Sequence, residues 1–283
     1  MDDARKVAEE QAALWNGSSG DAWVAAQTVL DDLFRPVETL LADTAAAMGA
    51  TDVLDVGCGT GATTIALARR LAPSGTCTGV DLSAPMIDVA RERAAHEESQ
   101  PRFVCADAQT HPFEPGAFDL LTSRFGVMFF GDPVAAFANL RRATAPGGAL
   151  RAVVWRGPQD NPFMTTAAHA AAEVLPEVAP LPSRPPGAPG QFAFADPDRV
   201  HAILDGSGWL DGDLEAVDLP CVMPASDLPG YVTRLGPLSV ALRGLDDADR
   251  ARVLEAVLPA FERFTDGDVV HVDIACWLLG ATA

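Results

Sequence analysis

From residue 52 onward, short apolar runs alternate with segments in which apolar residues recur at helical spacing. The apolar runs are typical of buried strands, and they span residues 52–56, 75–82, 101–107, 117–123 and 149–155. Helical spacing follows in residues 62–71, 85–97 and 133–144. Strands that alternate with helices predict an α/β fold, in which a mostly parallel sheet is covered by helices on both faces.

The segments outside this repeat have other patterns. Residues 1–48 predict two or three helices, and one of them is amphipathic, with Val29, Leu30, Leu33, Val37, Leu40 and Leu41. Residues 213–222 and 269–279 alternate with a two-residue period and predict the last two strands. The sequence thus predicts an N-terminal helical flap (residues 1–48) and an α/β domain (residues 49–283) with a helical lid inserted at about 226–266.

A long segment rich in proline and glycine precedes the last strands. It spans residues 176–197 and includes the stretch PEVAPLPSRPPGAPG. Such a composition predicts an irregular loop, and long loops of this kind often cover a binding site.

The charge of the chain narrows the class of partner. The 283 residues include 39 acidic and 20 basic ones, for a formal net charge of −19, so a nucleic acid would be repelled. No apolar run reaches the length of a membrane span, and the first residues, MDDARKVAEE, lack the apolar core of a secretion signal. The five cysteines have no CxxC spacing, which argues against a zinc site. We therefore expect a cytoplasmic protein without metal, nucleic acid or membrane attachment.

The candidate chemistry begins at a glycine-rich turn after the first strand, in VLDVGCGTGATTIALA (residues 53–68). A dinucleotide site would have the spacing GxGxxG and hold a pyrophosphate at the helix N-terminus. Here the spacing is GxGxG, and Asp55 at the strand end would repel two phosphates. S-adenosylmethionine carries an ammonium and a sulfonium, so the carboxylate favours that cofactor.

Two further carboxylates follow the next two strands. Asp81 lies at the position where a carboxylate accepts both ribose hydroxyls, which is common to nicotinamide and S-adenosylmethionine sites. Asp107 ends the third strand and is placed to accept from the adenine amine. The ordered set, with a carboxylate at three successive strand ends, predicts a nucleoside cofactor at this edge of the sheet.

These motifs resemble the class I S-adenosylmethionine-dependent methyltransferases, nearest in character to the ubiquinone/menaquinone-biosynthesis group. The similarity rests on LDVGCGTG, VDLS, CADAQ, FDLLTSRFG and PGGAL, within about residues 50–156. The resemblance implies a Rossmann-like seven-stranded sheet of order 3-2-1-4-5-7-6 with the seventh strand antiparallel. It also implies S-adenosylmethionine as cofactor and S-adenosylhomocysteine as product.

The resemblance also implies a set of cofactor-binding residues. Residues Asp55, Gly57, Cys58, Gly59, Thr60 and Gly61 would line the methionine end. The ribose and one adenine face would be held by Asp81, Leu82 and Met86, and the adenine by Asp107, Ala108 and Gln109. Ser123 and Arg124 would lie beside the methyl group. From the flap we add Trp23, because its polar, glycine-rich surroundings suggest closure over the cofactor.

The acceptor is less constrained by the sequence, because a sulfonium donor is already activated and needs no obligatory base. His111 and His169 are weak candidate bases, since a loop or helix histidine without a chemical role is the more common case for each position. We expect the acceptor pocket to include Trp15, Phe125, Met128, Asn161, Phe163 and His169. Such an apolar pocket favours O- or C-methylation of a small aromatic or polyketide-like molecule.

Two other readings stay open. A non-catalytic S-adenosylmethionine-binding protein would carry the same motifs, and a nicotinamide-dependent dehydrogenase would share the sheet and Asp81. Methylation of a nucleic-acid base is disfavoured, because Ser123-Arg124-Phe125-Gly126 replaces the Asn/Asp-Pro-Pro-aromatic tetrad after the fourth strand. The sequence leaves the oligomeric state open.

Overall fold

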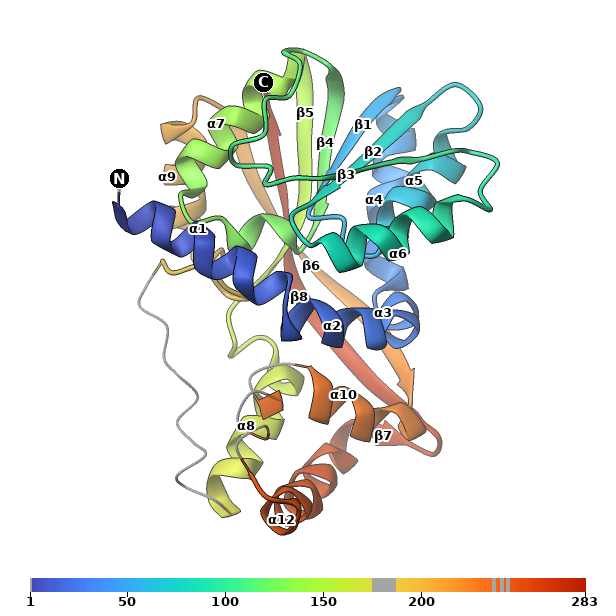
Figure 1. Ribbon diagram of the computed structural model, residues 1–283, viewed down its shortest axis with the longest axis vertical. Helices are drawn as coiled ribbons and strands as arrows, with labels where there is room; N and C mark the ends of the chain where they lie inside the picture. The colour runs from blue at the N-terminus through green and yellow to red at the C-terminus, as the bar shows by residue number, and fades with distance from the viewer. Residues whose placement is uncertain (1, 175–186, 236–237, 240–241, 243–244) are drawn as a thin grey trace.

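The computed structural model describes residues 2–174, 187–235, 238–239, 242 and 245–283. Its centre is one sheet with the strand order β3-β2-β1-β4-β5-β8-β6, and β7 pairs with β8 outside this path (Figure 1). The predicted order is therefore confirmed, with β8 as the seventh strand of the expected pattern and β7 as an additional two-residue strand. The strands are β1 (Asp52–Val56), β2 (Thr76–Asp81), β3 (Arg102–Cys105), β4 (Phe118–Arg124), β5 (Thr144–Trp155), β6 (Leu210–Pro224), β7 (Thr265–Asp266) and β8 (Val269–Thr282).

The strands β1 to β5 pair in parallel, whereas β8 runs antiparallel to both β5 and β6. Pairing of β5 with β8 ends at Trp155 opposite Cys276, but β6 and β8 stay paired down to Pro224 opposite Val269. The β6–β8 pair therefore reaches beyond the rest of the sheet, and Figure 1 shows it extending toward the helices at the lower end of the molecule.

Helices cover both faces of the sheet, as the alternating pattern predicts. On one face α4 and α5 share a buried cluster with β1, β2 and β4, while α7 and α9 lie together on the other side (Figure 1). The described helices of eight or more residues are α1 (Asp2–Trp15), α2 (Ser18–Ala25), α4 (Arg35–Met48), α5 (Ala62–Leu71), α6 (Ala84–Ala94), α7 (Pro133–Ala143), α8 (Pro162–Val174), α9 (Pro197–Gly206) and α12 (Asp247–Val257).

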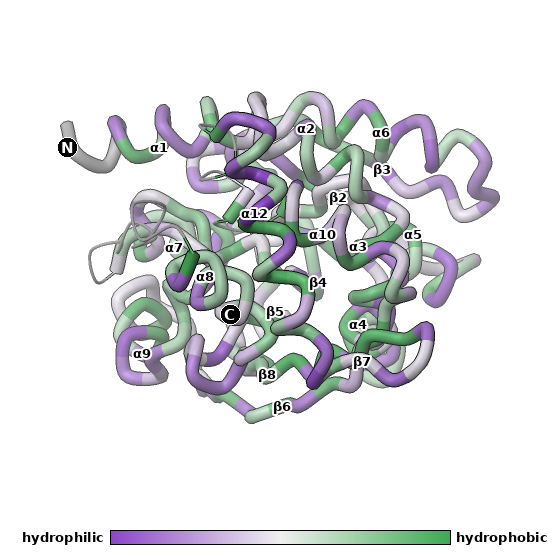
Figure 2. Tube along the Cα trace, turned by 90° about the horizontal axis from the view of Figure 1, so that it is seen from below, coloured by the Kyte–Doolittle hydropathy of each residue, from purple (hydrophilic) through white to green (hydrophobic). Residues whose placement is uncertain are grey.

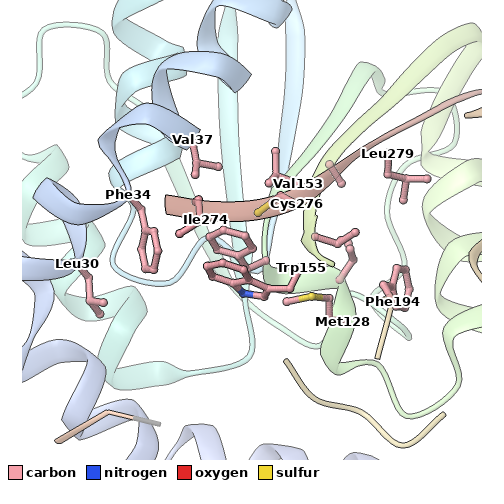
Figure 3. Packing of buried hydrophobic residues seen from close by; sticks show 14 of the residues in the cluster. Leu30, Phe34, Val37, Met128, Val153, Trp155, Phe194, Ile274, Cys276 and Leu279 are labelled. Carbon is pink, nitrogen blue, oxygen red and sulfur yellow. The ribbon is translucent and has the colours of Figure 1, made fainter. Parts of the chain in front are cut away.

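The N-terminal flap contains four helices rather than two or three, because α3 (Gln27–Leu33) is a separate short helix between α2 and α4. Gly17 lies at the N-cap of α2 and separates that helix from α1. A proline in the first turn of α4 marks the beginning of α4. The amphipathic side of α3 and α4 is buried: Leu30, Phe34 and Val37 belong to one buried cluster with Trp155 and Ile274, and Figure 3 shows Phe34 beside Ile274.

The lid region lies at the end of the β6–β8 pair. It contains η2 (Ala225–Asp227), α10 (Leu228–Arg234), α12, η3 (Leu258–Phe264) and β7, and α8 packs against α12 and η3. Half of the irregular loop predicted at 176–197, namely residues 176–186, lies outside the described residues. In Figure 2 the central strands β4, β5 and β8 are mostly hydrophobic in colour, whereas α1 at the edge alternates. None of the described helices is long and apolar enough to cross a membrane.

Candidate functional site

The site is built on the glycine loop at the carboxyl end of β1. Gly57, Gly59 and Gly61 all have positive φ values, a backbone conformation that residues with a side chain rarely adopt. Gly57 also lies against the turn after β4, since a Cβ at this position would come within 2.6 Å of Gly126 Cα. By contrast, a Cβ at Gly59 would meet only Met86 Sδ, at 3.6 Å. The loop thus leaves space above its middle glycine.

Asp81 holds the glycine loop from the neighbouring strand. Its Oδ2 accepts a hydrogen bond from the Gly59 N–H at 2.9 Å, and its Oδ1 accepts one from the Ser83 N–H at 2.8 Å. Burial raises the pKa of this carboxyl, while the backbone donors oppose the shift. Each oxygen retains a second lone pair, so Asp81 can still accept from a ligand hydroxyl.

Asp55 is buried at the end of β1 with one oxygen free. The Thr64 hydroxyl donates to its Oδ2 at 2.6 Å, whereas Oδ1 has no partner among the described residues. Burial raises the pKa of Asp55 from an ordinary 3.8 to about 6. A buried acceptor without a partner is unfavourable, so this oxygen is ready for a donor supplied by a ligand.

Arg124 ends β4 and is held by a strained turn. The Ser123 hydroxyl donates to Val56 O at 2.7 Å and accepts from the Gly126 N–H at 3.1 Å, and Phe125 has a φ of 66°. The Arg124 guanidinium lies 5.7 Å from the Phe34 ring centre, and its Nη1 is buried without a partner in the described chain. Burial lowers the pKa of Arg124, and the charges of Asp31, Glu38 and Asp55 oppose that shift.

A small cavity of about 40 Å³ joins these groups to the flap. Three of the buried polar atoms that lack a partner belong to residues on its wall, namely Asp55 Oδ1, Thr63 Oγ1 and Arg124 Nη1. The cavity is far smaller than the 300 Å³ or more that a nucleoside-sized ligand fills. Its lining consists of Trp23, Gln27, Leu30, Asp31, Asp55, Gly57, Cys58, Gly59, Thr60, Thr63, Arg124 and Phe125.

The flap is fastened to the segment that follows β2. The Asn16 side chain donates to Leu82 O at 3.1 Å and accepts from the Ala84 N–H at 2.9 Å. Ser83 occupies the N-cap position of α6, but its hydroxyl makes no capping bond and instead donates to Trp15 O at 2.7 Å. These bonds place the junction of α1 and α2 directly on the residues beside Asp81.

Two tryptophans of the flap pack next to this junction. The Trp15 ring meets Trp23 and Phe129 in edge-to-face contacts, with centroid distances of 6.0 and 5.1 Å. Arg93 adds a polar link, since it donates to Thr60 O at 2.7 Å and pairs with Asp31 at 2.7 Å. The flap therefore closes over the glycine loop in this structure.

Polar groups at the end of β3 form their own bonded set. Asp107 Oδ1 accepts from the Gln109 N–H, and Gln109 Oε1 accepts from the Asp132 N–H, both at 2.9 Å. Asp132 in turn caps α7. Asp107, Ala108 and Gln109 are thus held in a fixed loop, but they do not line the cavity described above.

Sequence reasoning missed several residues on the cavity wall. Gln27 and Asp31 come from α3, and Thr63 comes from the first turn of α5. The amphipathic pattern of the flap identified Leu30 as buried but gave no sign that polar residues on the same short helix would face the glycine loop.

Several residues expected in the acceptor pocket do not line the small cavity beside the glycine loop. Met128 is buried in the core, and Phe163 packs in the lid region against the rings of Tyr231, Phe261 and Phe264. Asn161 is buried, and its amide pairs with both backbone polar groups of Ala275 at 3.0 and 2.9 Å. Both polar atoms of the Asn161 side chain are therefore used in hydrogen bonds to β8.

Neither candidate base lines the small cavity beside the glycine loop. They also do not line a second cavity, which lies between α2 and the lid region and includes Asp21, Thr233 and Arg250 on its wall. His169 is exposed on α8. His111 lies on the loop after β3 with its ring 4.6 Å from that of Phe113. Of the expected pocket residues, Phe125 does line the small cavity, and its ring stacks on Trp155 at 4.4 Å.

Comparison with known proteins identifies the central part of the chain. Residues 53–148 match the family model described as a methyltransferase domain. The demethylmenaquinone methyltransferase of Staphylococcus aureus is 41% identical over 100 residues, which are 35% of this chain and 41% of that enzyme. The match therefore spans less than half of either protein.

Solved structures extend the similarity over most of the fold. The YcgJ protein of Bacillus subtilis has a TM-score of 0.55 at 20% identity, covering 87% of this chain and 97% of that one. A provisionally named methyltransferase of Bacillus halodurans has a TM-score of 0.52 at 19% identity with the same coverage. At this identity the likenesses show the fold. Residues 53–148 are thus a methyltransferase domain of the class I type, whose cofactor is S-adenosylmethionine.

Proposed function

We propose that the chain is an enzyme that transfers a methyl group from S-adenosylmethionine to a small aromatic or polyketide-like molecule. The observation that carries the proposal is the set of buried, unpartnered polar atoms on the cavity beside the glycine loop. Asp55 Oδ1 suits the ammonium group of the cofactor, and Asp81 retains lone pairs for its ribose hydroxyls. The residues present therefore fit the cofactor.

S-adenosylmethionine supplies an activated methyl group on a sulfonium sulfur when it is bound. The chain has to align the acceptor and exclude water, because displacement at the methyl carbon requires an in-line approach. Trp23, which lines the cavity beside the glycine loop, and Trp15, which packs against Trp23, would provide the exclusion. Because the cavity beneath them is only about 40 Å³, entry of the cofactor requires the flap to move.

The acceptor class rests on the character of the walls. Phe125 lines the cavity and stacks on the buried Trp155 at the carboxyl ends of β4 and β5, the edge where ligands of such sheets bind. A flat aromatic acceptor would pack well against the Phe125 ring. The Staphylococcus aureus relative is named as a demethylmenaquinone methyltransferase, and a quinone-related acceptor is compatible with this acceptor class.

The experiment is an untargeted transfer assay. The purified chain is incubated with extract or a panel of phenols and quinols and with S-adenosylmethionine labelled in its methyl carbon, and labelled products are identified by mass spectrometry. We expect label in an aromatic small molecule. Tight binding of the cofactor without transfer to any acceptor would favour the binding-only reading. Binding of a nicotinamide dinucleotide would favour the dehydrogenase reading, which Asp55 beside the loop opposes. A cytoplasmic location belongs to the same proposal.

A further inference from the structure

The second cavity, between α2 and the lid region, is large enough for a ligand of its own. Its volume is about 410 Å³, which lies within the range of cavities that bind small molecules. One wall is formed by α2, and the other by α10, α12 and the chain between them. In Figure 1, α2 lies directly above α10. We call this space the lid cavity.

The helix α2 separates the lid cavity from the small cavity beside the glycine loop. Ser18, Ala22 and Ala25 have the spacing of one helix face, and all three line the lid cavity. Trp23 projects from a different face, because successive residues of a helix are turned by about 100°, and it lines the cavity beside the glycine loop. A ligand in the lid cavity would therefore contact the flap and the lid at once without occupying the cofactor site.

The lid side of this cavity carries two arginines that do not pair with an acid. Arg234 ends α10 and Arg250 lies on α12, and both residues are exposed. Within the described part of the chain, neither guanidinium forms an ion pair with a carboxylate. Arg250 donates one hydrogen bond, from Nη2 to Leu242 O at 3.1 Å. A guanidinium has five N–H donors, so most of these donors are open to a ligand.

A neighbouring arginine shows that unpaired cations are not simply the rule on this helix. Arg252 lies two residues from Arg250 on α12, outside the cavity wall, and it pairs with Asp249 at 2.9 Å. The chain has 39 acidic and 20 basic residues, and its net charge of −19 repels anions at long range. An anion-binding site on this protein therefore needs cations that lie close together and are not neutralised by acids, as on the lid side of this cavity.

We propose that the lid cavity binds a small molecule with an acidic group, a carboxylate or a phosphate, which pairs with Arg234 and Arg250. The planar guanidinium recognises the oxygens of both groups through two parallel N–H···O bonds. Because α2 forms the opposite wall, the bound molecule also holds the flap against the lid.

The rest of the wall limits what the ligand can be. Ala22 and Ala25 on α2 and Leu242 on the lid side supply apolar surface for its body. Asp21 on α2 would repel a second acidic group there, but it can accept a hydrogen bond from a hydroxyl or an ammonium. The cavity thus suits a compact molecule with a single acidic group rather than a polyanion. That molecule is either the methyl acceptor, an alternative that rests on the proposed function, or a separate effector.

The test is a calorimetric titration of the full chain, without cofactor, with benzoate, phenyl phosphate and uncharged benzyl alcohol. We expect both acids to bind and the alcohol to bind about tenfold more weakly or less, because only the acids can pair with the arginines. Arg234→Gln and Arg250→Gln should each weaken binding of both acids about tenfold and leave the alcohol unchanged. Added salt should weaken the acids alone, because exposed charges are screened.

Two further variants control for charge and for geometry. Arg252→Gln removes a cation from the same helix but outside the cavity wall, so it should leave the affinity for both acids unchanged. Arg250→Lys keeps the charge without the planar fork and should recover part of the affinity. Equal weakening by Arg250→Gln and Arg252→Gln would mean that only net charge matters, which overturns the proposal. Absence of acid binding to the wild-type chain at millimolar concentrations overturns it as well.

A transfer assay with labelled S-adenosylmethionine distinguishes the two sources of the acid. If the labelled product is acidic and Arg234→Gln raises the KM of its precursor without changing kcat, the acceptor is the ligand. If the labelled product has no acidic group and its precursor has the same KM in both proteins, while benzoate still binds, the ligand is a separate effector. Lack of transfer to any acceptor would contradict the proposed function alone, because the titration with benzoate needs no cofactor.

Discussion

The glycine loop and the flap are both part of the site, but they are held together by different kinds of contact. In the loop, Asp55 and Asp81 stand at the ends of adjacent parallel strands and bond to Thr64 and Gly59 close by. In the flap, Asn16 reaches Leu82 and Ala84 across more than sixty residues of sequence. The loop is thus determined by local sequence and strand order, whereas its cover depends on tertiary packing.

The largest effect is expected from glycines within the loop. Gly57→Ala should lower the free energy of unfolding by about 2–5 kcal/mol, because a Cβ would clash with the Gly126 backbone and φ is positive. Gly59→Ala has only the φ penalty, about 1–2 kcal/mol. Urea denaturation measures both. Equal losses would mean that the contact between the loop and the turn after β4 is not tight.

Asp55 provides the next test, because its buried carboxylate destabilises the folded protein and is at the same time expected to bind the ligand. Its raised pKa means that the folded state favours the protonated form, so its contribution to stability falls as the pH rises from about 4 to 6 and stays lost above. A shift from 3.8 to about 6 corresponds to roughly 3 kcal/mol. Asp55→Asn should therefore be more stable than the wild type at pH 7.5, by up to that amount.

The same variant should bind S-adenosylhomocysteine more weakly, because the neutral amide cannot pair with an ammonium. Wild-type affinity should in turn decline as the pH falls below 6, where Asp55 takes up a proton. Thermal melts and calorimetry at several pH values measure both quantities. An Asp55→Asn protein that is less stable at pH 7.5 and binds as tightly would contradict this role.

The sequence predicted the sheet and its strand-end carboxylates better than the contacts between segments that are distant in sequence. The strand order and the carboxylates at strand ends follow from apolar runs and turn positions, and the structure places them at one edge of the sheet. Ser83 lies at the N-cap position of α6, but its hydroxyl bonds to Trp15, a partner that no local pattern reveals. Asn161 and Met128 do not line the cavity beside the glycine loop, because burial among distant strands decides their contacts, and their place in an acceptor pocket stays a prediction.

Two asparagines allow the stability contributed by buried side-chain hydrogen bonds to be compared with that contributed by exposed ones. Asn161→Ala would leave the buried N–H of Ala275 without its partner, while the Ala275 carbonyl would keep only the bond from the Arg156 N–H, at about 1–3 kcal/mol of stability. Asn16 lies in an exposed position, so Asn16→Ala should lower global stability by less than about 1 kcal/mol.

The two asparagine variants should differ in hydrogen exchange as well. Asn16→Ala should speed exchange in residues 10–25 while the central strands stay protected, because it releases the flap alone. Native-state exchange followed by mass spectrometry gives this pattern. Loss of protection in the strands of Asn16→Ala would show that the flap is part of the core rather than a separate cover.

The central claim is that the cavity between the glycine loop and the flap receives S-adenosylmethionine. Calorimetric titration of the unmodified chain with S-adenosylhomocysteine and, in parallel, with NAD⁺ tests it most directly. The account predicts one S-adenosylhomocysteine site with a dissociation constant in the micromolar range and no heat from NAD⁺. Binding of NAD⁺, or saturating amounts of S-adenosylhomocysteine without any binding, would contradict it.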